Sequence, residues 1–193
     1  LNFPLRIILK IIELSKHEII EIFDTKSNRL KILGQTYKQL NITEEREIII
    51  KKLNSCLVSL GLPKYSEDND MYSEHLVIFA GLSYSSFNPK RILELGTYLG
   101  VTTVILSKLF PDSKITTIDL KDDDPIFKNT YKRKSSLKEF IKKRDKLIRN
   151  NEKINFIQKN SLFLTFQLNL EDQDLIWVDG AHGYPVVTSD ITN

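Results

Sequence analysis

The sequence predicts an α/β fold in which an α-helical N-terminal region, residues 1–70, precedes a doubly wound parallel sheet in residues 71–193. Apolar residues recur at helical spacing through the first region, which indicates helices. From Met71 onward, short apolar runs of strand length alternate with helical segments. This alternation favours a parallel sheet with crossover helices, because neighbouring parallel strands need a long connection.

Composition places the chain among ordinary globular proteins. Its 193 residues suffice for one domain with a helical extension, and a net charge of +3 does not by itself indicate a nucleic-acid or membrane partner. The single cysteine, Cys56, excludes a disulfide framework and a multi-cysteine metal site. Charged residues interrupt the apolar N-terminus well short of the roughly 20 apolar residues that a membrane span needs. We therefore expect a cytoplasmic protein without a membrane partner, in which Cys56 is a buried helical residue.

The N-terminal region is expected to be helical throughout. A first helix is indicated by four apolar residues that share one helical face, namely Leu5, Ile8, Leu9 and Ile12. A second helix is predicted from an N-cap at Thr43 to a terminating Gly61. The pattern leaves open whether this region is a lid, an acceptor pocket or an interface for a homo-oligomer.

The second region is expected to contain four strands and three helices. The helices are predicted at residues 71–86, 101–110 and 135–149, and the strands at residues 91–95, 114–119, 154–158 and 175–178.

The sharpest feature is a glycine loop between the first strand and the next helix, Glu94-Leu95-Gly96-Thr97-Tyr98-Leu99-Gly100. Glycines let the backbone turn tightly and approach a ligand, and the helix N-terminus offers N–H groups to a carboxylate. Asp119 ends the next strand, where its carboxylate can accept hydrogen bonds from both ribose hydroxyls. The loop and Asp119 together predict a nucleotide site beyond the carboxyl ends of the strands.

The loop departs from two common phosphate-binding motifs. A dinucleotide fingerprint would carry glycine where Glu94 stands, and a P-loop would continue with Gly-Lys-Ser/Thr. An acidic residue followed by Gly-x-x-x-Gly resembles motif I of the class I (Rossmann-like) S-adenosylmethionine-dependent methyltransferases instead. The likeness continues through residues 115–119, 154–161 and 174–184. The Asp-Gly-x-His-x-Tyr pattern of residues 179–184 is similar to a small-molecule branch related to the catechol-type O-methyltransferases.

This resemblance implies methyl transfer from S-adenosylmethionine to a small-molecule acceptor, with oxygen as the expected acceptor atom. It implies that Glu94 helps to hold the methionine amino group, and that Asn160 stands where the family commonly has an adenine-contacting aspartate. The cofactor-binding residues that it implies are Glu94, Gly96, Thr97, Tyr98, Gly100, Asp119, Asn160 and Ser161.

Asp179 and His182 are the candidates for catalysis, because they follow the fourth strand and would face the cofactor crevice. In the catechol-type enzymes the acid at the Asp179 position ligates Mg²⁺, so the resemblance implies Asp179 as a metal ligand or acceptor-orienting group. His182 would then be a base or a second ligand. Alternatively, Asp179 caps a following helix and His182 is an ordinary loop histidine.

The fifth to seventh strands of a methyltransferase sheet are absent from the sequence. The apolar strand 175–178 would then form an exposed edge, which favours aggregation. We therefore expect the natural protein to be longer at its C-terminus, or another chain or segment to cover this edge.

Residues 128–149 carry ten lysines and arginines against two acids. Contact with phosphate would make the protein a nucleic-acid methyltransferase, with Lys142, Lys143 and Arg144 as the residues to neutralise. We favour a solvated helix, because no base-reading pattern accompanies the charge. The sequence is also compatible with a non-catalytic binding module and, more distantly, with a nicotinamide oxidoreductase.

Overall fold

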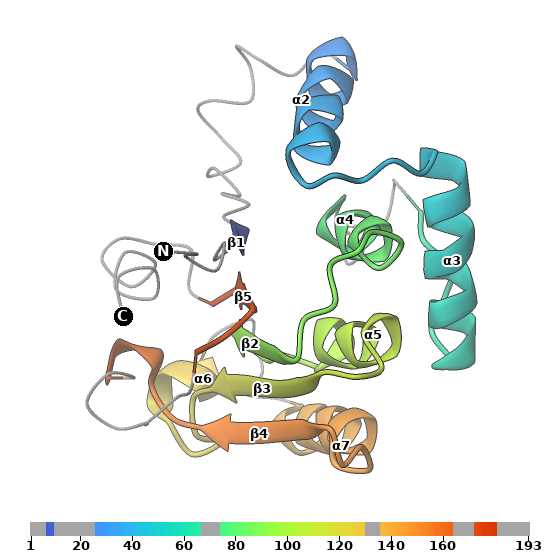
Figure 1. The fold of residues 1–193 in the computed structure, drawn as a ribbon. Coiled ribbons are helices and arrows are strands. Elements are labelled where there is room, and N and C mark those ends of the chain that lie inside the picture. Colours follow the sequence, from blue (N-terminus) through green and yellow to red (C-terminus); the bar gives the residue numbers. More distant parts are fainter. Residues whose placement is uncertain (1–6, 10–25, 67–73, 130–135, 164–171, 181–193) are drawn as a thin grey trace. The chain divides into compact units, whose positions relative to one another are not determined.

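The computed structural model describes residues 7–9, 26–66, 74–129, 136–163 and 172–180 (Figure 1). The chain forms two compact units. One comprises residues 1–10 and 89–193, and the other comprises residues 11–88.

The first unit contains a five-stranded sheet with the strand order β1-β5-β2-β3-β4 (Figure 1). All neighbouring strands are parallel. The strands are β1 (Ile7–Leu9), β2 (Arg91–Leu95), β3 (Lys114–Asp119), β4 (Ile154–Gln158) and β5 (Leu175–Val178). The last four have the predicted bounds, so the prediction of a parallel α/β sheet is confirmed.

β1 corrects the expectation for the start of the chain. Ile8 and Leu9 lie in a strand rather than a helix, and they pair with Ile176 and Trp177 of β5. A short apolar run fits both periodicities, and here pairing with β5 decides between them. As a result, β5 is paired on both sides within this chain, and β1 is the segment that covers the side of β5 away from β2.

The carboxylate of Asp174 locks the register where β2 begins. It accepts hydrogen bonds from the backbone N–H groups of Lys90 and Arg91, at 2.7 and 2.9 Å. The N–H of Asp174 in turn donates to the carbonyl of Arg91 at 2.9 Å. Asp174 thereby fixes the start of β5 beside the start of β2, although it is 83 and 84 positions away from Arg91 and Lys90 in the sequence.

The helices of this unit are α5 (Val101–Leu109), α6 (Pro125–Asn129) and α7 (Leu137–Ile148), and a single 3₁₀ turn spans Ser161–Phe163. α5 and α7 lie side by side along the sheet (Figure 1). They confirm the helices predicted at residues 101–110 and 135–149, with slightly shorter ends. The five-residue α6 was not predicted, because it is too short to show a helical period.

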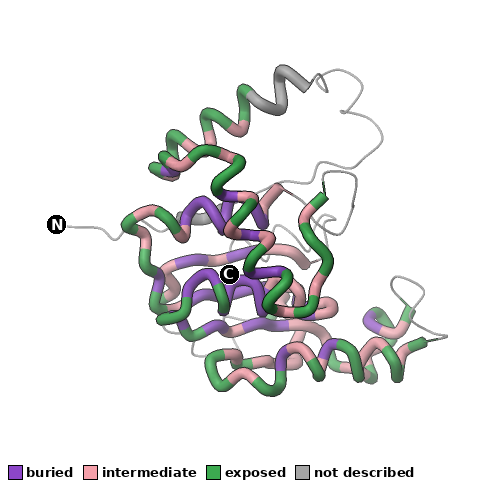
Figure 2. The backbone as a smooth tube through the Cα atoms, turned by 90° about the vertical axis from the view of Figure 1, so that its right-hand side faces the viewer, coloured by how far each residue is buried: buried purple, intermediate pink, exposed green. Residues whose placement is uncertain are grey.

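Side chains of the central strands divide between two faces of the sheet. Leu93, Leu95 and Ile118 form a buried apolar cluster on one face. On the other face, Glu94 and its neighbours lie against α5. Four of the five residues of β2 are buried, and Glu94 is one of them, so its carboxyl group is held inside the protein. Figure 2 marks the buried residues in purple.

The second unit consists of α2 (Lys26–Gln39), α3 (Arg46–Ser59) and α4 (Glu74–Leu82). α3 packs against α4, and an ion pair joins Arg46 to Glu74. The N-cap of α3 is Glu45, whose extended backbone precedes the first turn, rather than the predicted Thr43. The buried Cys56 confirms the interpretation of this residue as a small apolar one.

Among the helices that the structure describes, none combines the length and the apolar character needed to cross a membrane.

The neighbouring isoleucines of α3 provide a matched test of the second unit. Ile49 is 0 % exposed and Ile48 is 38 % exposed. We expect Ile49→Ala to lower the free energy of unfolding by about 2–5 kcal/mol, because it leaves a cavity in the core. Ile48→Ala should change it by about 0.5 kcal/mol or less. Urea denaturation followed by circular dichroism measures both, and equal losses would contradict the packing described for α3.

Candidate functional site

Three strand ends meet at the centre of the candidate site. β3 ends at Asp119, and Gly96 and Asp179 follow directly after β2 and β5. Because β2 lies between β3 and β5, Gly96 has the two acids on either side. Two hydrogen bonds extend the ladders to this level: Gly96 N donates to Ile118 O at 2.8 Å, and Asp179 N donates to Leu95 O at 2.7 Å.

Gly96 is required at its position by both conformation and space. Its φ of 102° lies in the region that L residues rarely adopt. A Cβ atom there would lie 2.6 Å from the carbonyl carbon of Asp179 and 2.8 Å from the nitrogen of Gly180. The glycine therefore allows the backbone after β2 to touch the backbone after β5.

Gly100 ends the loop and forms the N-cap of α5. Its φ is 76°, and a Cβ atom there would collide with the Cγ2 atom of Ile148. This N-cap makes no side-chain hydrogen bond to the first turn of α5. A helix N-terminus that lacks a side-chain cap is a favourable place for a carboxylate or another anion.

Asp119 links the end of β3 to the glycine loop. Its Oδ2 atom accepts a hydrogen bond from the N–H of Tyr98 at 2.9 Å, and its Oδ1 atom accepts one from Leu120 at 2.8 Å. A carboxylate has about four acceptor positions, so these bonds orient it without exhausting its capacity for ligand hydroxyls.

Glu94 lies inside the protein rather than on the crevice surface. It is 1 % exposed, and its Oε2 atom accepts hydrogen bonds from the hydroxyls of Thr103 and Thr117. The hydroxyl of Thr97 lies 2.6 Å from that of Thr117. The predicted ligand contacts of Glu94 and Thr97 thus coincide with a buried cluster that joins β2, β3, α5 and the glycine loop.

Burial favours the protonated form of Glu94. Burial raises the pKa of its carboxyl group to about 8, and the charges of Asp179 and Asp119 add to the effect against the two threonine hydrogen bonds. Three carboxyl groups therefore share this end of the sheet, and one of them keeps its proton at neutral pH.

Tyr98 and Asn160 contribute to the site through their backbone and turns. Tyr98 has a φ of 48°, and its ring packs edge-on against Phe140 of α7 at a centroid distance of 5.1 Å. The side-chain oxygen of Asn160 accepts a hydrogen bond from Leu162 at 3.0 Å and so shapes the 3₁₀ turn that contains Ser161.

The two candidate catalytic residues differ in what the structure describes. Asp179 lies beside Gly96 at the exit of β5, whereas His182 falls outside the described residues. Within the described ranges, no group of three or more His, Cys, Asp or Glu residues could hold a metal ion.

Two threonines of the buried cluster were missed by sequence reasoning. Thr117 is the register partner of Glu94 across β2 and β3, and Thr103 lies in α5 nine positions after Glu94. Aligning the first residues of the two predicted strands, Arg91 and Lys114, would have placed Thr117 opposite Glu94. No pattern in the sequence showed that Thr103 is on the side of α5 that faces Glu94.

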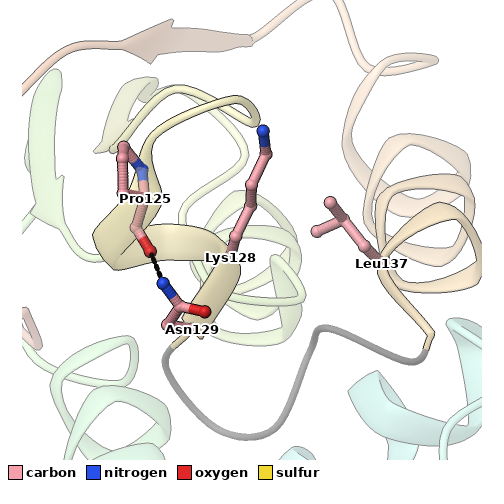
Figure 3. A pocket seen from close by; sticks show the side chains of 4 residues that line it. All are labelled: Pro125, Lys128, Asn129 and Leu137. Atoms are coloured by element: carbon pink, nitrogen blue, oxygen red, sulfur yellow. Dashed lines mark hydrogen bonds between the residues drawn. The ribbon is translucent and has the colours of Figure 1, made fainter.

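A pocket lies between α6 and α7 (Figure 3). It is lined by Pro125, Lys128, Asn129 and Leu137, and the Asn129 amide donates to the Pro125 carbonyl at 2.7 Å. None of these four residues was predicted as a site residue.

The geometry of Gly96 leads to a paired glycine test. We expect Gly96→Ala to destabilise the protein by about 2 kcal/mol or more, because it adds strain at positive φ and a collision with Asp179. Gly34 lies in α2, and a Cβ atom there would meet no atom within 4 Å, so Gly34→Ala should raise the free energy of unfolding by up to about 1 kcal/mol. Thermal denaturation compares them, and an unaffected Gly96→Ala variant would contradict the close backbone contact.

The raised pKa of Glu94 leads to a pH-dependent test. The unfolded chain loses this proton near pH 4.5, whereas the folded protein keeps it to about pH 8. Between these values the folded state binds more protons, so its stability falls as the pH rises. Glu94→Gln removes this loss, and its stability relative to wild type should rise from pH 5 to pH 8 by a value on the order of 3 kcal/mol.

Urea denaturation at a series of pH values measures this difference. The exposed Glu139→Gln variant is the control, and it should follow the wild-type profile. Parallel profiles for Glu94→Gln and wild type would show that Glu94 is ionised in the folded protein.

The chain is similar to several solved methyltransferase structures. It is 18 % identical to an S-adenosylhomocysteine-bound methyltransferase of Podospora anserina, covering 88 % of this chain and 64 % of that one with a TM-score of 0.42. It is 16 % identical to an O-methyltransferase of Streptomyces achromogenes involved in tomaymycin synthesis, in complex with S-adenosylmethionine, covering 81 % and 63 % with a TM-score of 0.37. The Bacillus cereus O-methyltransferase in complex with S-adenosylhomocysteine is 14 % identical, covering 77 % and 60 % with a TM-score of 0.35. This chain spans less than two thirds of the length of each of the three.

A family match covers the whole candidate site. No curated protein matches the sequence. The family described as a methyltransferase domain, however, matches residues 93–193, which is more than half of the chain. The match begins within β2 and includes every residue from the glycine loop to Asp179 and His182. On this evidence the chain belongs to the family of methyltransferase domains.

Proposed function

We propose that the protein transfers a methyl group from S-adenosylmethionine to a small-molecule acceptor. The observation that carries the proposal is the position of Gly96 between Asp119 and Asp179, at the carboxyl ends of three parallel strands. When bound, S-adenosylmethionine supplies a methyl group on a sulfonium ion. The residues around Gly96 would bind and orient this molecule.

Each end of the cofactor has a matching group in the described residues. Asp119 would accept hydrogen bonds from the ribose hydroxyls, because its carboxylate is already oriented by Tyr98 and Leu120. The N-terminus of α5, which lacks a side-chain cap at Gly100, would face the carboxylate of the amino acid part. Asn160 and Ser161, in the turn after β4, would contact the adenine.

The charges at this end of the sheet favour a cationic ligand. The charges of Asp119 and Asp179 repel a negative charge on the buried Glu94, and this repulsion contributes to the raised pKa of Glu94, which keeps its proton at neutral pH. A sulfonium or ammonium group placed among them would relieve the repulsion. We propose that Glu94 acts on the ligand through this field and through the loop that it supports.

Asp179, with His182 after it, would orient the acceptor and take up the proton of an acceptor hydroxyl. A carboxylate or imidazole near the reacting oxygen serves as a general base, which suits O-methylation of the catechol type. Mg²⁺ needs several oxygen ligands, and among the described residues no group of three or more His, Cys, Asp or Glu side chains is arranged to hold a metal ion. We therefore propose an orienting role for Asp179, and ligation of Mg²⁺ stays a prediction.

The nucleic-acid alternative loses one of its three named residues. Lys142 and Lys143 are exposed on α7, but Arg144 is 0 % exposed and forms ion pairs within the protein. A phosphate backbone could not reach its guanidinium group. The remaining lysines are accounted for by an ordinary solvated helix face.

Three further expectations stay predictions. They are the division into a helical region of residues 1–70 and a cofactor-binding region of residues 71–193, a cytoplasmic location, and assembly into a homo-oligomer.

Calorimetric titration with S-adenosylhomocysteine tests the proposed cofactor. We expect binding to the wild-type chain, no binding of NADH, and an affinity about 10–100-fold weaker in Asp119→Ala, because charged hydrogen bonds to the ribose are lost. The control is Asp123→Ala, which removes an exposed acid from the segment that follows β3.

Each outcome of the titration has a distinct meaning. Equal affinity in Asp119→Ala and Asp123→Ala would contradict the ribose contact. An absence of binding to the wild-type chain would favour a non-catalytic binding module, and binding of NADH would favour an oxidoreductase.

A further inference from the structure

The inner face of α7 contacts both loops of the candidate cofactor site. Phe140, Arg144 and Ile148 recur every four residues, which places them on one side of the helix. Phe140 packs against the ring of Tyr98, and Ile148 closes the space above Gly100. The glycine loop is thus held by the first and last residues of this row, and Arg144 lies between them.

Arg144 forms ion pairs with two carboxylates, those of Asp122 and Asp145. It is 0 % exposed, and its two terminal nitrogens donate to the two carboxylate oxygens of Asp122 at 2.6 and 3.1 Å. Its Nε and Nη2 atoms also donate to Asp145 at 3.0 and 2.9 Å. The central carbon of the Arg144 guanidinium lies over the ring of Phe156 in β4, 4.6 Å from the ring centroid.

Burying an arginine is unfavourable unless its charge is paired and its N–H groups are hydrogen-bonded, so the position of its partners shows which parts of the protein it joins. Asp145 is the next residue in the same helix, so its pairing with Arg144 does not join α7 to another element. Asp122 is different, because it lies in the segment that connects β3 to α6. Of the two ion pairs of Arg144, the one with Asp122 therefore joins α7 to another part of the protein.

Asp122 lies three residues after Asp119, and a second contact holds it in place. The side-chain amide of Gln158 donates to Asp122 at 2.7 Å, and Gln158 is the register partner of Asp119 across β3 and β4. Burial alone would raise the pKa of Asp122, but the hydrogen bond and the charge of Arg144 hold it below the ordinary value of an aspartate. The segment directly after Asp119 is thus fixed from two sides.

We propose that Arg144 is a positioning residue of the cofactor site, which acts through Asp122 to hold Asp119 and the glycine loop in one arrangement. The proposal rests on the function proposed above, because it takes Asp119 as the ribose-binding residue. Arg144 does not touch the ligand. Its bidentate ion pair fixes the chain after β3 relative to α7, while Phe140 and Ile148 of the same helix fix the loop after β2.

The test compares Arg144→Met with Lys143→Met. Both variants lose one positive charge from α7, but only Arg144 is inside the protein, whereas Lys143 is exposed. We expect the dissociation constant for S-adenosylhomocysteine to rise about tenfold in Arg144→Met and to stay at the wild-type value in Lys143→Met. Arg144→Lys should lie between them, because an ammonium group cannot bridge both oxygens of Asp122 and reach Asp145.

A second measurement, made without ligand, separates positioning from general stability. Hydrogen exchange of the backbone amides of residues 119–124 should be faster in Arg144→Met, while exchange in the core of β2 stays slow. Titrations are made at a temperature at which circular dichroism shows each variant folded. If Arg144→Met does not fold, Asp122→Asn removes the same ion pair from the loop side and should show the same two changes.

The outcomes distinguish this inference from the proposed function. A folded Arg144→Met variant with wild-type affinity and wild-type exchange would overturn the inference and leave the proposed function intact. If the wild-type protein binds no S-adenosylhomocysteine, the proposed function fails, and the exchange rates still decide whether Arg144 holds the segment after Asp119.

Discussion

The contact between two backbones at Gly96 is the constraint on which the site depends. Carbonyl and amide atoms of Asp179 and Gly180 occupy the space where any other residue at position 96 would place its Cβ atom. This contact brings the exits of β2 and β5 together, and Asp119 lies on the other side at the exit of β3. The glycine therefore serves the packing of the sheet first, and the ligand site is a consequence of that packing.

Two ionisable side chains, Glu94 and Arg144, are buried on the same side of the sheet, and the protein accommodates them in different ways. Glu94 is satisfied by threonine hydroxyls and retains its proton. Arg144 retains its charge and is satisfied by two carboxylates and an aromatic face. A carboxyl group can become neutral at moderate cost, whereas a guanidinium group cannot, so it must bring its counter-ions with it. The contacts of Glu94 join the glycine loop to β3 and α5, and the contacts of Arg144 join the segment after β3 to α7.

The sequence predicted the parts of this fold that depend on local pattern. β2 to β5 have the predicted bounds because each is a short apolar run between turn residues. The location of the site followed from the rule that ligands bind at the carboxyl ends of parallel strands. Ile8 and Leu9 were assigned wrongly because their helical spacing is compatible with a strand, and only the pairing with β5 shows which one forms.

Arg144 illustrates what the sequence could not settle. Its spacing from Phe140 and Ile148 fits the inner face of α7, but in the sequence only its charge was considered, which grouped it with Lys142 and Lys143. Its main partner, Asp122, lies in a connecting segment that has no periodic pattern. Glu94 presented a similar problem, because motif resemblance identifies a residue as part of a site without stating which way its side chain points. Both cases needed the positions of elements that are distant in the sequence.

The order of strands in the sheet differs from their order along the chain, and this difference matters while the protein is being made. β2 pairs with β3 on one side and with β5 on the other, yet β5 begins at residue 175, about eighty positions after β2. A nascent chain that has already formed β2, β3 and β4 therefore leaves one side of β2 open until β5 emerges from the ribosome. Open strand edges can pair with other chains, so the protein is exposed to aggregation during this interval. The pairing that completes the centre of the sheet, and with it the site around Gly96, therefore forms only after β5 has been synthesised.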